Sequence, residues 1–253
     1  MKIIKILLLL GVVLSTQPAF AYSDDGHKIV AKLAWQKLSP FARQNIERIL
    51  GVGEQQFVNA ATWADDIKGD DRYSYLKPLH YVNLPANASK YDRKRDCRKD
   101  KCVVEAIFDF SEMAKSSSNK KAKLALRMLI HLIGDVHQPM HAGLKEDRGG
   151  NWYRIKYNGD TINLHKLWDN QLVRRIHKDW QEAVKQLEMP SQAEVLGPVQ
   201  WAEESHKLAM EVAYGTAEGK TVSEGYLVEA ERVTRQQLAL AGWRLAMWLN
   251  KLW

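Results

Sequence analysis

Apolar residues recur at helical spacing through most of the chain, whereas strand-like alternation is confined to one short stretch. That stretch, 152–164, contains Asn158-Gly159, a strong signal for a two-residue hairpin. We therefore predict an all-α fold, a single multi-helix domain with one small β-hairpin near 152–164. The longest helical stripe, within 222–252, consists of Leu227, Ala230, Val233, Leu238, Ala241, Leu245 and Trp248.

The remaining helices are bounded by cap and breaker residues. Ser39-Pro40 is a typical helix start, and Pro139 ends a helix that contains His131. The stretch 69–101 reads as loop-rich and is long enough to suggest function. Further helices are expected over 24–38, 40–50, 57–67, 103–115, 120–137, 164–187 and 199–217.

The first residues resemble a secretory leader. Two lysines precede an apolar run, Ile6–Val13, and Ala19-Phe20-Ala21 is a small-x-small cleavage signal. An uncleaved membrane anchor is the alternative, but the run is shorter than the roughly 20 residues needed to span a bilayer. We expect residues 1–21 to be a signal peptide cleaved after Ala21. The mature domain, 22–253, would then be secreted or periplasmic, without a membrane anchor.

Composition and cysteine usage limit the class of protein further. With 45% hydrophobic and 26% charged residues the chain is an ordinary globular protein, which excludes disorder and multi-pass membrane folds. The net charge of +7 favours anionic partners such as nucleic acid, lipid headgroups or phosphate esters. Cys97 and Cys102 could form a short disulfide loop in an oxidising compartment, and as a zinc pair they would lack partners.

Histidines paired with aspartates are the strongest chemical signal. His131 and Asp135 are four residues apart on the buried face of a predicted helix, and His165 and Asp169 repeat the spacing. A single pair is readily explained as a core histidine bonded to a carboxylate, but two pairs favour a metal site. Neutral imidazole and carboxylate are ligands that zinc accepts. Further candidates lie upstream at His27, Asp65 and His80.

Several short motifs occur in an order that resembles a known family. They are Gly26-His27, Trp63-Ala64-Asp65, His80-Tyr81, His131-x3-Asp135-x5-His141 with Gln138-Pro139 inside it, Gly149-Gly150-Asn151 and Asn163-Leu164-His165-x3-Asp169. Each is weak alone, but together they resemble the zinc-dependent S1/P1 nucleases, which share a fold with bacterial zinc phospholipases C. The resemblance extends over essentially all of 22–253.

The resemblance implies three zinc ions per chain. The first would be held by Asp65, His80, His131 and Asp135, and the third by His141, His165 and Asp169. The second would share Asp135 and bind His27 with the amino and carbonyl groups of Tyr22. Asp65 would also be the catalytic residue, orienting the attacking water. The implied activity is hydrolysis of single-stranded RNA and DNA to 5′-phosphate products, with 3′-nucleotides also dephosphorylated.

The expected substrate-binding residues include departures from the family pattern. Lys68 stands where fungal members have Arg, which removes a bidentate fork for phosphate. Asn83 replaces an Asp used for base recognition, so base preference does not transfer. Tyr81 is a candidate stacking platform, and Asn151 belongs to the glycine-rich motif. Tyr22 replaces the family's usual Trp, but metal binding should survive because the implied ligands there are backbone atoms.

Two other functions remain as alternatives at this stage. A zinc phospholipase C uses similar metals but usually has Glu where this chain has Asp169, and the positive charge also favours a nuclease. A non-enzymatic nucleic-acid-binding domain with structural zinc would close each site with four protein ligands. We expect a monomer whose substrates are single-stranded nucleic acid and 3′-nucleotides. We expect no ligand role for His137, His177 or His206, and we read the basic run near Arg93 as a solvated loop.

Overall fold

The computed structural model describes residues 22–194 and 196–253, and the predicted signal peptide lies outside this part of the chain. The α-helices are α1 (Asp24–Lys37), α2 (Pro40–Leu50), α3 (Glu54–Ala60), α4 (Trp63–Asp66), α5 (Arg93–Asp96), α6 (Val103–Ala114), α7 (Asn119–Val136), α8 (Leu164–Lys166), α9 (Leu172–Ile176), α10 (Trp180–Lys185), α11 (Pro198–Glu211) and α12 (Glu224–Leu252). The 3-10 helices are η1 (Asp71–His80), η2 (Arg98–Asp100), η3 (Pro139–Ala142) and η5 (Ala213–Gly215), and η4 (Leu167–Gln171) is a π-helix.

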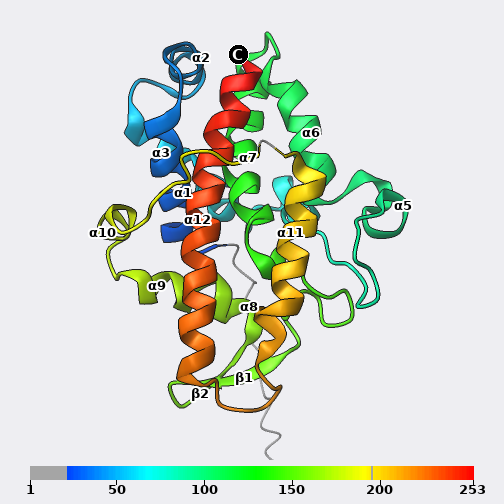
Figure 1. Cartoon of the computed structure of the whole chain (residues 1–253). Coiled ribbons are helices and arrows are strands. Elements are labelled where there is room, and N and C mark those ends of the chain that lie inside the picture. Colours follow the sequence, from blue (N-terminus) through cyan, green and yellow to red (C-terminus); the bar gives the residue numbers. More distant parts are fainter. Residues whose placement is uncertain (1–21, 195) are drawn as a thin grey trace, which may run out of the picture.

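Helix α7 forms the centre of the fold. Every residue from 128 to 136 is buried, as expected for a helix that is enclosed on all sides. It contacts α1, α2, α6, α11 and α12, and Figure 1 shows it behind α12 and between α1 and α6. His131 and Asp135 therefore lie in the interior, each with a fully buried side chain.

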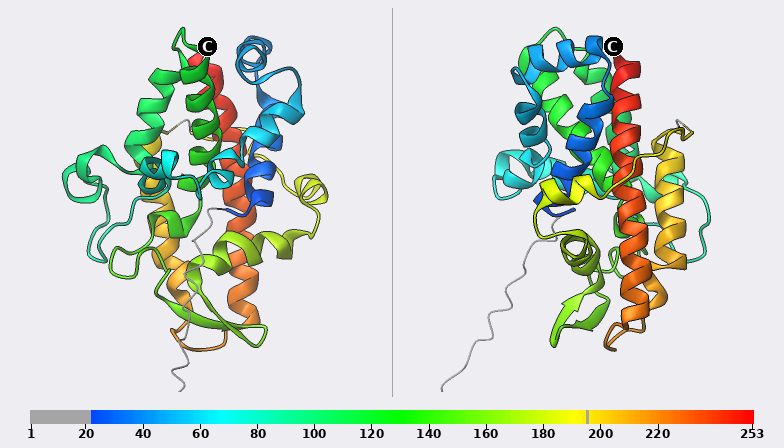
Figure 2. Two further views of the ribbon diagram at one scale, coloured as in Figure 1. Left: turned by 180° about the vertical axis from the view of Figure 1, so that it is seen from behind. Right: turned by 60° about the vertical axis from the view of Figure 1, so that its left-hand side comes forward.

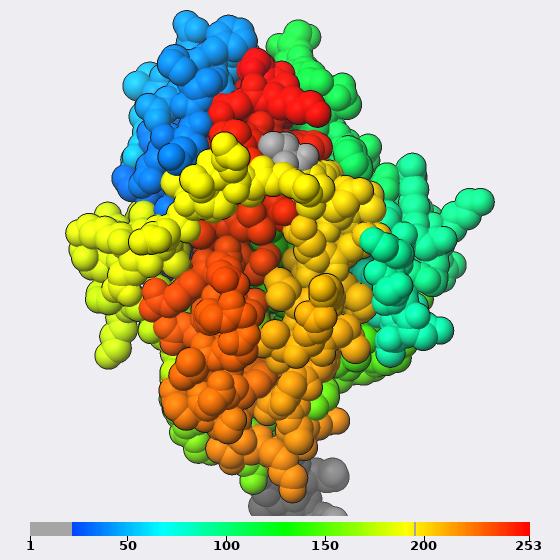
Figure 3. Space-filling model, viewed as in Figure 1, coloured from blue at the N-terminus to red at the C-terminus, as the bar shows by residue number. Residues whose placement is uncertain are grey.

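One face of the molecule is formed by α11 and α12, which lie side by side (Figure 3). Trp201 of α11 is fully buried and packs edge-on against Trp248 of α12, with ring centroids 5.3 Å apart. Arg244 of α12 also bonds Glu204 of α11 at 2.6 Å. Large side chains thus fill the space between the two helix backbones. The loop that carries α5 projects from the side of this face (Figures 1 and 2).

The predicted hairpin is present. Strands β1 (Arg154–Tyr157) and β2 (Asp160–Asn163) pair antiparallel, with Arg154 opposite Asn163 and Tyr157 opposite Asp160. Asn158 and Gly159 both have positive φ, which a tight two-residue turn of this kind requires. The all-α prediction with one small hairpin is confirmed for the described residues. The hairpin lies at the end of the molecule where α12 begins (Figure 2).

The predicted helix over 57–67 is wrong as a single element. The chain forms α3 and α4 instead, with a turn at Ala61 and Thr62 between them. The backbone carbonyl of Ala61 accepts a 2.8 Å hydrogen bond from Nδ1 of His131. A continuous helix would direct that carbonyl along its own axis, so the break supplies an acceptor to the histidine on α7.

The predicted helix over 164–187 is also interrupted. The chain is continuously helical through α8, the π-turn η4 and α9, and the interruption begins at His177, which is extended and precedes α10. Asp169 lies within the π-turn, a form that is rare and often found at functional sites. The stretch 69–101, predicted to be loop-rich, contains the ten-residue helix η1 in addition to α5 and η2.

The described part of the chain contains no helix long and apolar enough to cross a membrane. Cys97 and Cys102, each almost fully buried, are joined by a disulfide. It closes the short loop that contains η2, between α5 and α6.

Candidate metal centre

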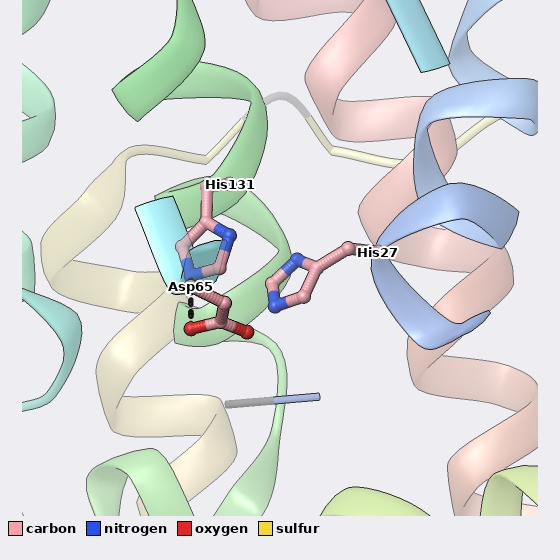
Figure 4. Close-up of side chains that lie close together, drawn as sticks. All are labelled: His27, Asp65 and His131. Carbon is pink, nitrogen blue, oxygen red and sulfur yellow. Dashed lines mark ion pairs between the residues drawn. The ribbon is translucent and has the colours of Figure 1, made fainter. Parts of the chain in front are cut away.

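Three groups of buried side chains converge in the interior. In each group one potential ligand atom per residue lies within 4.8 Å of the others. Figure 4 shows one of them, with His27 from α1 and His131 from α7 turned toward the carboxylate of Asp65. The groups are His27, Asp65 and His131; His80, His131 and Asp135; and His141, His165 and Asp169. Every histidine and aspartate expected as a ligand from the sequence is thus brought into one of these groups.

Four of the histidines are oriented in the same way. Each directs Nδ1 to a backbone carbonyl oxygen, which leaves Nε2 to face the cluster. The acceptors are Leu76 for His80 at 3.0 Å, Ala61 for His131 at 2.8 Å, His80 for His141 at 2.7 Å and Gly149 for His165 at 2.6 Å. A hydrogen bond of this kind fixes the ring and the tautomer, as in many metal-binding histidines.

His27 is held by packing rather than by a hydrogen bond. Its ring stacks on that of His131 with centroids 3.8 Å apart, and Tyr22 packs edge-on against it at 6.2 Å. On the facing helix, a Cβ atom at Gly134 would lie 2.9 Å from His27 Nδ1. Glycine at 134 therefore leaves the space that this ring occupies.

Asp135 lies between the groups. Its Oδ1 is 3.4 Å from His27 Nε2 and 3.6 Å from His141 Nδ1, while Oδ2 is 3.2 Å from His131 Nε2. These distances place the Asp135 carboxylate beside histidines from all three groups. Asp65 lies close to the rings of His27 and His131, with its Oδ1 3.7 Å from His131 Nε2. Both carboxylates are thus placed to serve more than one group.

The electrostatics favour ionised carboxylates. Burial alone would raise the pKa of Asp135, but the charges of His131 and His141 outweigh it and hold that pKa well below its usual range. Asp169 follows the same logic: burial opposes ionisation, and His165 and His141 lower its pKa to about 2. Burial lowers the pKa of His80 to about 3, which keeps this imidazole in its neutral, ligand form.

A metal fits the donor set. Buried polar atoms normally have hydrogen-bond partners, and unpaired ones are costly. Here a connected group of buried atoms forms no well-aligned hydrogen bond among the described residues: both nitrogens of His27, both oxygens of Asp135, and Nε2 of His80, His131 and His141. Zinc accepts imidazole nitrogen and carboxylate oxygen as ligands when thiolate is absent. Cations bound between these side chains would satisfy the unpaired atoms.

The N-terminal segment reaches the same region. The Ser23 amide donates a 2.8 Å hydrogen bond to the backbone carbonyl of Asp169, and the Tyr22 side chain is 1% exposed. A Cβ at Gly26 would lie 2.9 Å from the Tyr22 Cβ, so these two residues are in close contact. The backbone of Tyr22 is therefore anchored beside His27 and Asp169.

The expected substrate-binding residues differ in their surroundings. Lys68 forms an ion pair with Asp65, and Tyr81, directly after His80, is 43% exposed. Asn83 is half-buried, with its Oδ1 close to Gly149. Asn151 instead donates a 2.9 Å hydrogen bond to the Arg148 carbonyl in its own loop.

The remaining histidines lie outside the three groups. His137 is buried, bonds the Ile133 carbonyl at 2.6 Å and lies 3.1 Å from Arg244. His206 is also buried and bonds two backbone carbonyls, whereas His177 is exposed. His137 and His206 are therefore satisfied core histidines.

Gln138 has a role that the sequence did not reveal. Its amide donates a 2.6 Å hydrogen bond to Asp169 Oδ1, while its Oε1 accepts from the Met140 amide at 2.5 Å. Gly134 was also missed as a determinant of His27. A glycine inside a buried helix is a recognised signal of close packing, and this could have identified it.

The geometry defines a helical domain with a buried histidine–carboxylate centre of the kind that binds metal ions. Comparison with known families gives the assignment: the S1/P1 nuclease family model matches residues 22–253, and the chain belongs to this family. Endonuclease 2 of Arabidopsis thaliana is 29% identical over 91% of this chain and 90% of its own length. Nuclease P1 of Penicillium citrinum is 27% identical over 90% and 96%, and nuclease S1 of Aspergillus oryzae is 33% identical over 62% and 56%. The protein is accordingly a nuclease, a hydrolase of phosphodiester bonds.

Proposed function

We propose that the protein is a secreted or periplasmic zinc-dependent endonuclease that hydrolyses single-stranded RNA and DNA to 5′-phosphate products. It would also remove phosphate from 3′-nucleotides, act as a monomer and bind three zinc ions per chain. The mature enzyme would comprise 22–253, after removal of residues 1–21. The observation that carries the proposal is the connected set of buried ligand atoms without well-aligned partners in the described chain.

The proposed ligands are the members of the three groups, with those of the first two groups divided differently between two ions. Asp65, His80, His131 and Asp135 would hold one ion, and His141, His165 and Asp169 another. His27 and the backbone of Tyr22 would hold the ion that shares Asp135. Zinc bound in this way supplies Lewis acidity, which activates water near neutral pH and stabilises charge on the phosphate and on the leaving oxygen. No protein nucleophile is then needed.

Asp65 is the proposed catalytic residue. One carboxylate oxygen can face the ligand group while the other accepts a hydrogen bond from the attacking water and aims it at phosphorus. Lys68, in contact with this carboxylate, places positive charge where the phosphate would approach. As an ammonium it offers a point charge, whereas arginine would offer a planar fork. Tyr81 is exposed enough to stack on a base beside the centre.

The comparisons support this proposal at the level of reaction class. The relatives are named as endonucleases or nucleases, and two match about nine-tenths of this chain. The family match begins at residue 22, the residue expected after signal cleavage. The positive net charge favours a polyanionic substrate over zwitterionic phosphatidylcholine.

The decisive experiment is a digest by the mature, zinc-loaded protein of single-stranded RNA, duplex RNA and phosphatidylcholine vesicles at equal concentration. We expect single strands to be cut fastest, with 5′-phosphate ends, and the rate to fall as salt rises. Dephosphorylation of a 3′-nucleotide, with the 5′-isomer as control, tests the second activity. Preferential hydrolysis of phosphatidylcholine would instead assign a phospholipase C.

A further inference from the structure

An exposed tryptophan lies on the loop that orients His165 and has no role in the proposed ligand set. Trp152 is 57% exposed, and the guanidinium of Arg148 lies 4.1 Å from its ring centroid. Arg148 is itself exposed and has no acidic partner among the described residues. The guanidinium therefore covers one face of the indole. The rest of this exposed ring, with a cation beside it that no carboxylate of the described residues neutralises, forms a surface suited to a flat anionic ligand.

The loop that carries this pair is held in an unusual conformation. Arg148, Gly149 and Gly150 have φ values of 57°, 65° and 77°, so three consecutive residues occupy the left-handed region. For Arg148, a residue with a Cβ, this conformation is uncommon and costs energy. Asp147 stabilises it, because its side chain accepts from the Gly150 amide at 2.7 Å and its carbonyl accepts from the Trp152 amide at 3.0 Å. The backbone under Trp152 is therefore fixed.

The same loop orients a proposed zinc ligand. The Gly149 carbonyl accepts the 2.6 Å hydrogen bond from His165 Nδ1, and the Gly150 carbonyl accepts from the His165 amide at 3.3 Å. On its other side, a Cβ at Gly149 would lie 2.9 Å from Asn83 Oδ1. Trp152 is thus anchored two residues from the atoms that orient His165, on a segment packed against Asn83.

We propose that Trp152 and Arg148 form a second nucleotide-binding subsite, which stacks one unpaired base of a single-stranded polynucleotide and contacts its neighbouring phosphate. The inference rests on the proposed function. Any base can stack on the indole face that Arg148 does not cover, and the guanidinium on the other face can bind the adjacent phosphate. In a duplex the base faces are already stacked and paired, so the subsite selects single strands. A polynucleotide long enough to reach this subsite would therefore bind more tightly than a single nucleotide at the cleaved bond.

The test measures binding of a hydrolysis-resistant, phosphorothioate-linked oligodeoxynucleotide to the metal-loaded mature protein. Loss of one base–aromatic stack typically weakens binding by about 5- to 150-fold, and we expect Trp152→Ala to raise Kd by about 10-fold. Trp152→Phe should recover most of the affinity, because an aromatic face is retained. The KM for polyuridylate should rise in parallel with Kd.

Phe41→Ala is the matched control, because Phe41 is 61% exposed and lies on α2. We expect it to bind the oligonucleotide like the unchanged protein. Equal affinity of the Trp152→Ala variant and the unchanged protein would overturn the subsite, as would equal losses in the Ala and Phe variants. Weakened binding of phosphatidylcholine vesicles with intact oligonucleotide binding would also overturn it, by indicating a lipid-facing residue.

Arg148 provides an independent measurement. Removing one phosphate contact to a single strand should reduce the slope of log affinity against log salt by about 0.7. We expect this change for Arg148→Ala and a retained slope for Arg148→Lys. Arg232→Ala, an exposed arginine paired with Glu229 on α12, is the control and should leave the slope unchanged. A slope unaffected by Arg148→Ala would remove the phosphate contact from the inference.

These outcomes separate the subsite from the proposed function. If the unchanged protein binds and cuts single strands while the Trp152 and Arg148 variants behave like their controls, only the subsite is wrong. If the unchanged protein neither binds nor cuts single-stranded nucleic acid, the proposed function fails and the subsite fails with it.

Discussion

The side-chain amide of Gln138 donates a 2.6 Å hydrogen bond to Oδ1 of Asp169, and both side chains are almost completely buried. The bond leaves Asp169 Oδ2 facing His165 Nε2 at 3.1 Å. Oδ1 itself also lies 3.5 Å from His141 Nε2. Gln138 thus fixes the orientation of a carboxylate whose two oxygens face the two histidines of its group. Partners of this kind commonly contribute a large part of the affinity of a metal site.

Gln138→Glu should therefore weaken metal binding by this group. The substitution replaces a donor with an acceptor, so two carboxylates would face each other at hydrogen-bond distance. We expect a loss of about 10- to 100-fold in activity or in affinity for one of the three ions, measured by metal titration of the chelated protein. Gln186→Glu, at an exposed position after α10, is the control. Similar behaviour of the two variants would contradict the positioning role of Gln138.

Asp65→Asn should separate metal content from turnover. An amide oxygen can still coordinate a cation, but an amide is a poorer acceptor for the hydrogen bond that orients water. We expect most of the zinc to remain and kcat to fall by about 10²- to 10⁴-fold. The measurements are elemental analysis and steady-state kinetics on single-stranded RNA. His177→Ala, an exposed histidine outside the groups, should change kcat little, and equal losses in both variants would refute the assignment.

Metal removal should abolish activity while preserving most of the helix signal. The hydrophobic core extends well beyond the three groups, so the fold does not depend on the ions alone. Stability should nevertheless fall, because the buried carboxylates lose their cations. Free zinc at about 1,000 times Kd contributes about 4 kcal/mol, which corresponds to a shift in Tm of roughly 8–16 °C.

The matching measurements are elemental analysis, circular dichroism and thermal unfolding before and after chelation. We expect three zinc ions per mature chain and recovery of both Tm and activity when zinc is restored. A content near one ion per chain after gentle purification would exclude the trinuclear proposal.

Gly134→Ala should damage the site although alanine is the better helix former. The added Cβ would lie 2.9 Å from His27 Nδ1, so the ring must move. We expect overpacking to lower stability by about 1–3 kcal/mol and to weaken the ion held by His27. Gly225→Ala is the matched control, because a Cβ at this helical position meets nothing within 4 Å. Thermal unfolding and zinc content of both variants test the idea, which fails if they are equally stable and equally loaded.

Long helices with clear periodicity were predictable from the sequence. Helices α1, α2, α6, α7 and α12 begin and end within about two residues of their expected bounds, because capping and apolar spacing are local properties. The turn chemistry of Asn158-Gly159 likewise predicted the hairpin. The spacing of His131 and Asp135 on α7 correctly placed both side chains in the interior.

The breaks in the helices were not predictable, because their causes are tertiary. The chain turns at Ala61 where its carbonyl bonds His131, a residue 70 positions away. The π-turn around Asp169 brings its carboxylate to Gln138, 31 positions away. Local propensity carries no information about such partners, so the break at Ala61 and the π-turn within the continuous helical stretch 164–176 were both read as regular α-helix. The exposure of Trp152 also depends on packing that periodicity does not encode.

The N-terminus provides the most specific prediction of the proposed metal centre. Tyr22 is buried beside His27, and the next amide, that of Ser23, is bonded to the Asp169 carbonyl. If the amino nitrogen and carbonyl oxygen of Tyr22 are ligands, cleavage after Ala21 is a condition for activity. A protein with one extra residue before Tyr22 has a peptide nitrogen at this position, which is a poor zinc ligand, and additional chain where the ion should bind.

We therefore expect the extended protein to bind two zinc ions instead of three and to lose most of its activity, with its helix content unchanged. Tyr22→Phe, in the correctly processed chain, is the matched control, because it retains both backbone donors and removes only a buried hydroxyl without a partner in the described structure. This variant should bind three ions and remain active. N-terminal sequencing, elemental analysis and RNA digestion measure the outcome. Three ions and full activity in the extended protein would show that Tyr22 is not a ligand.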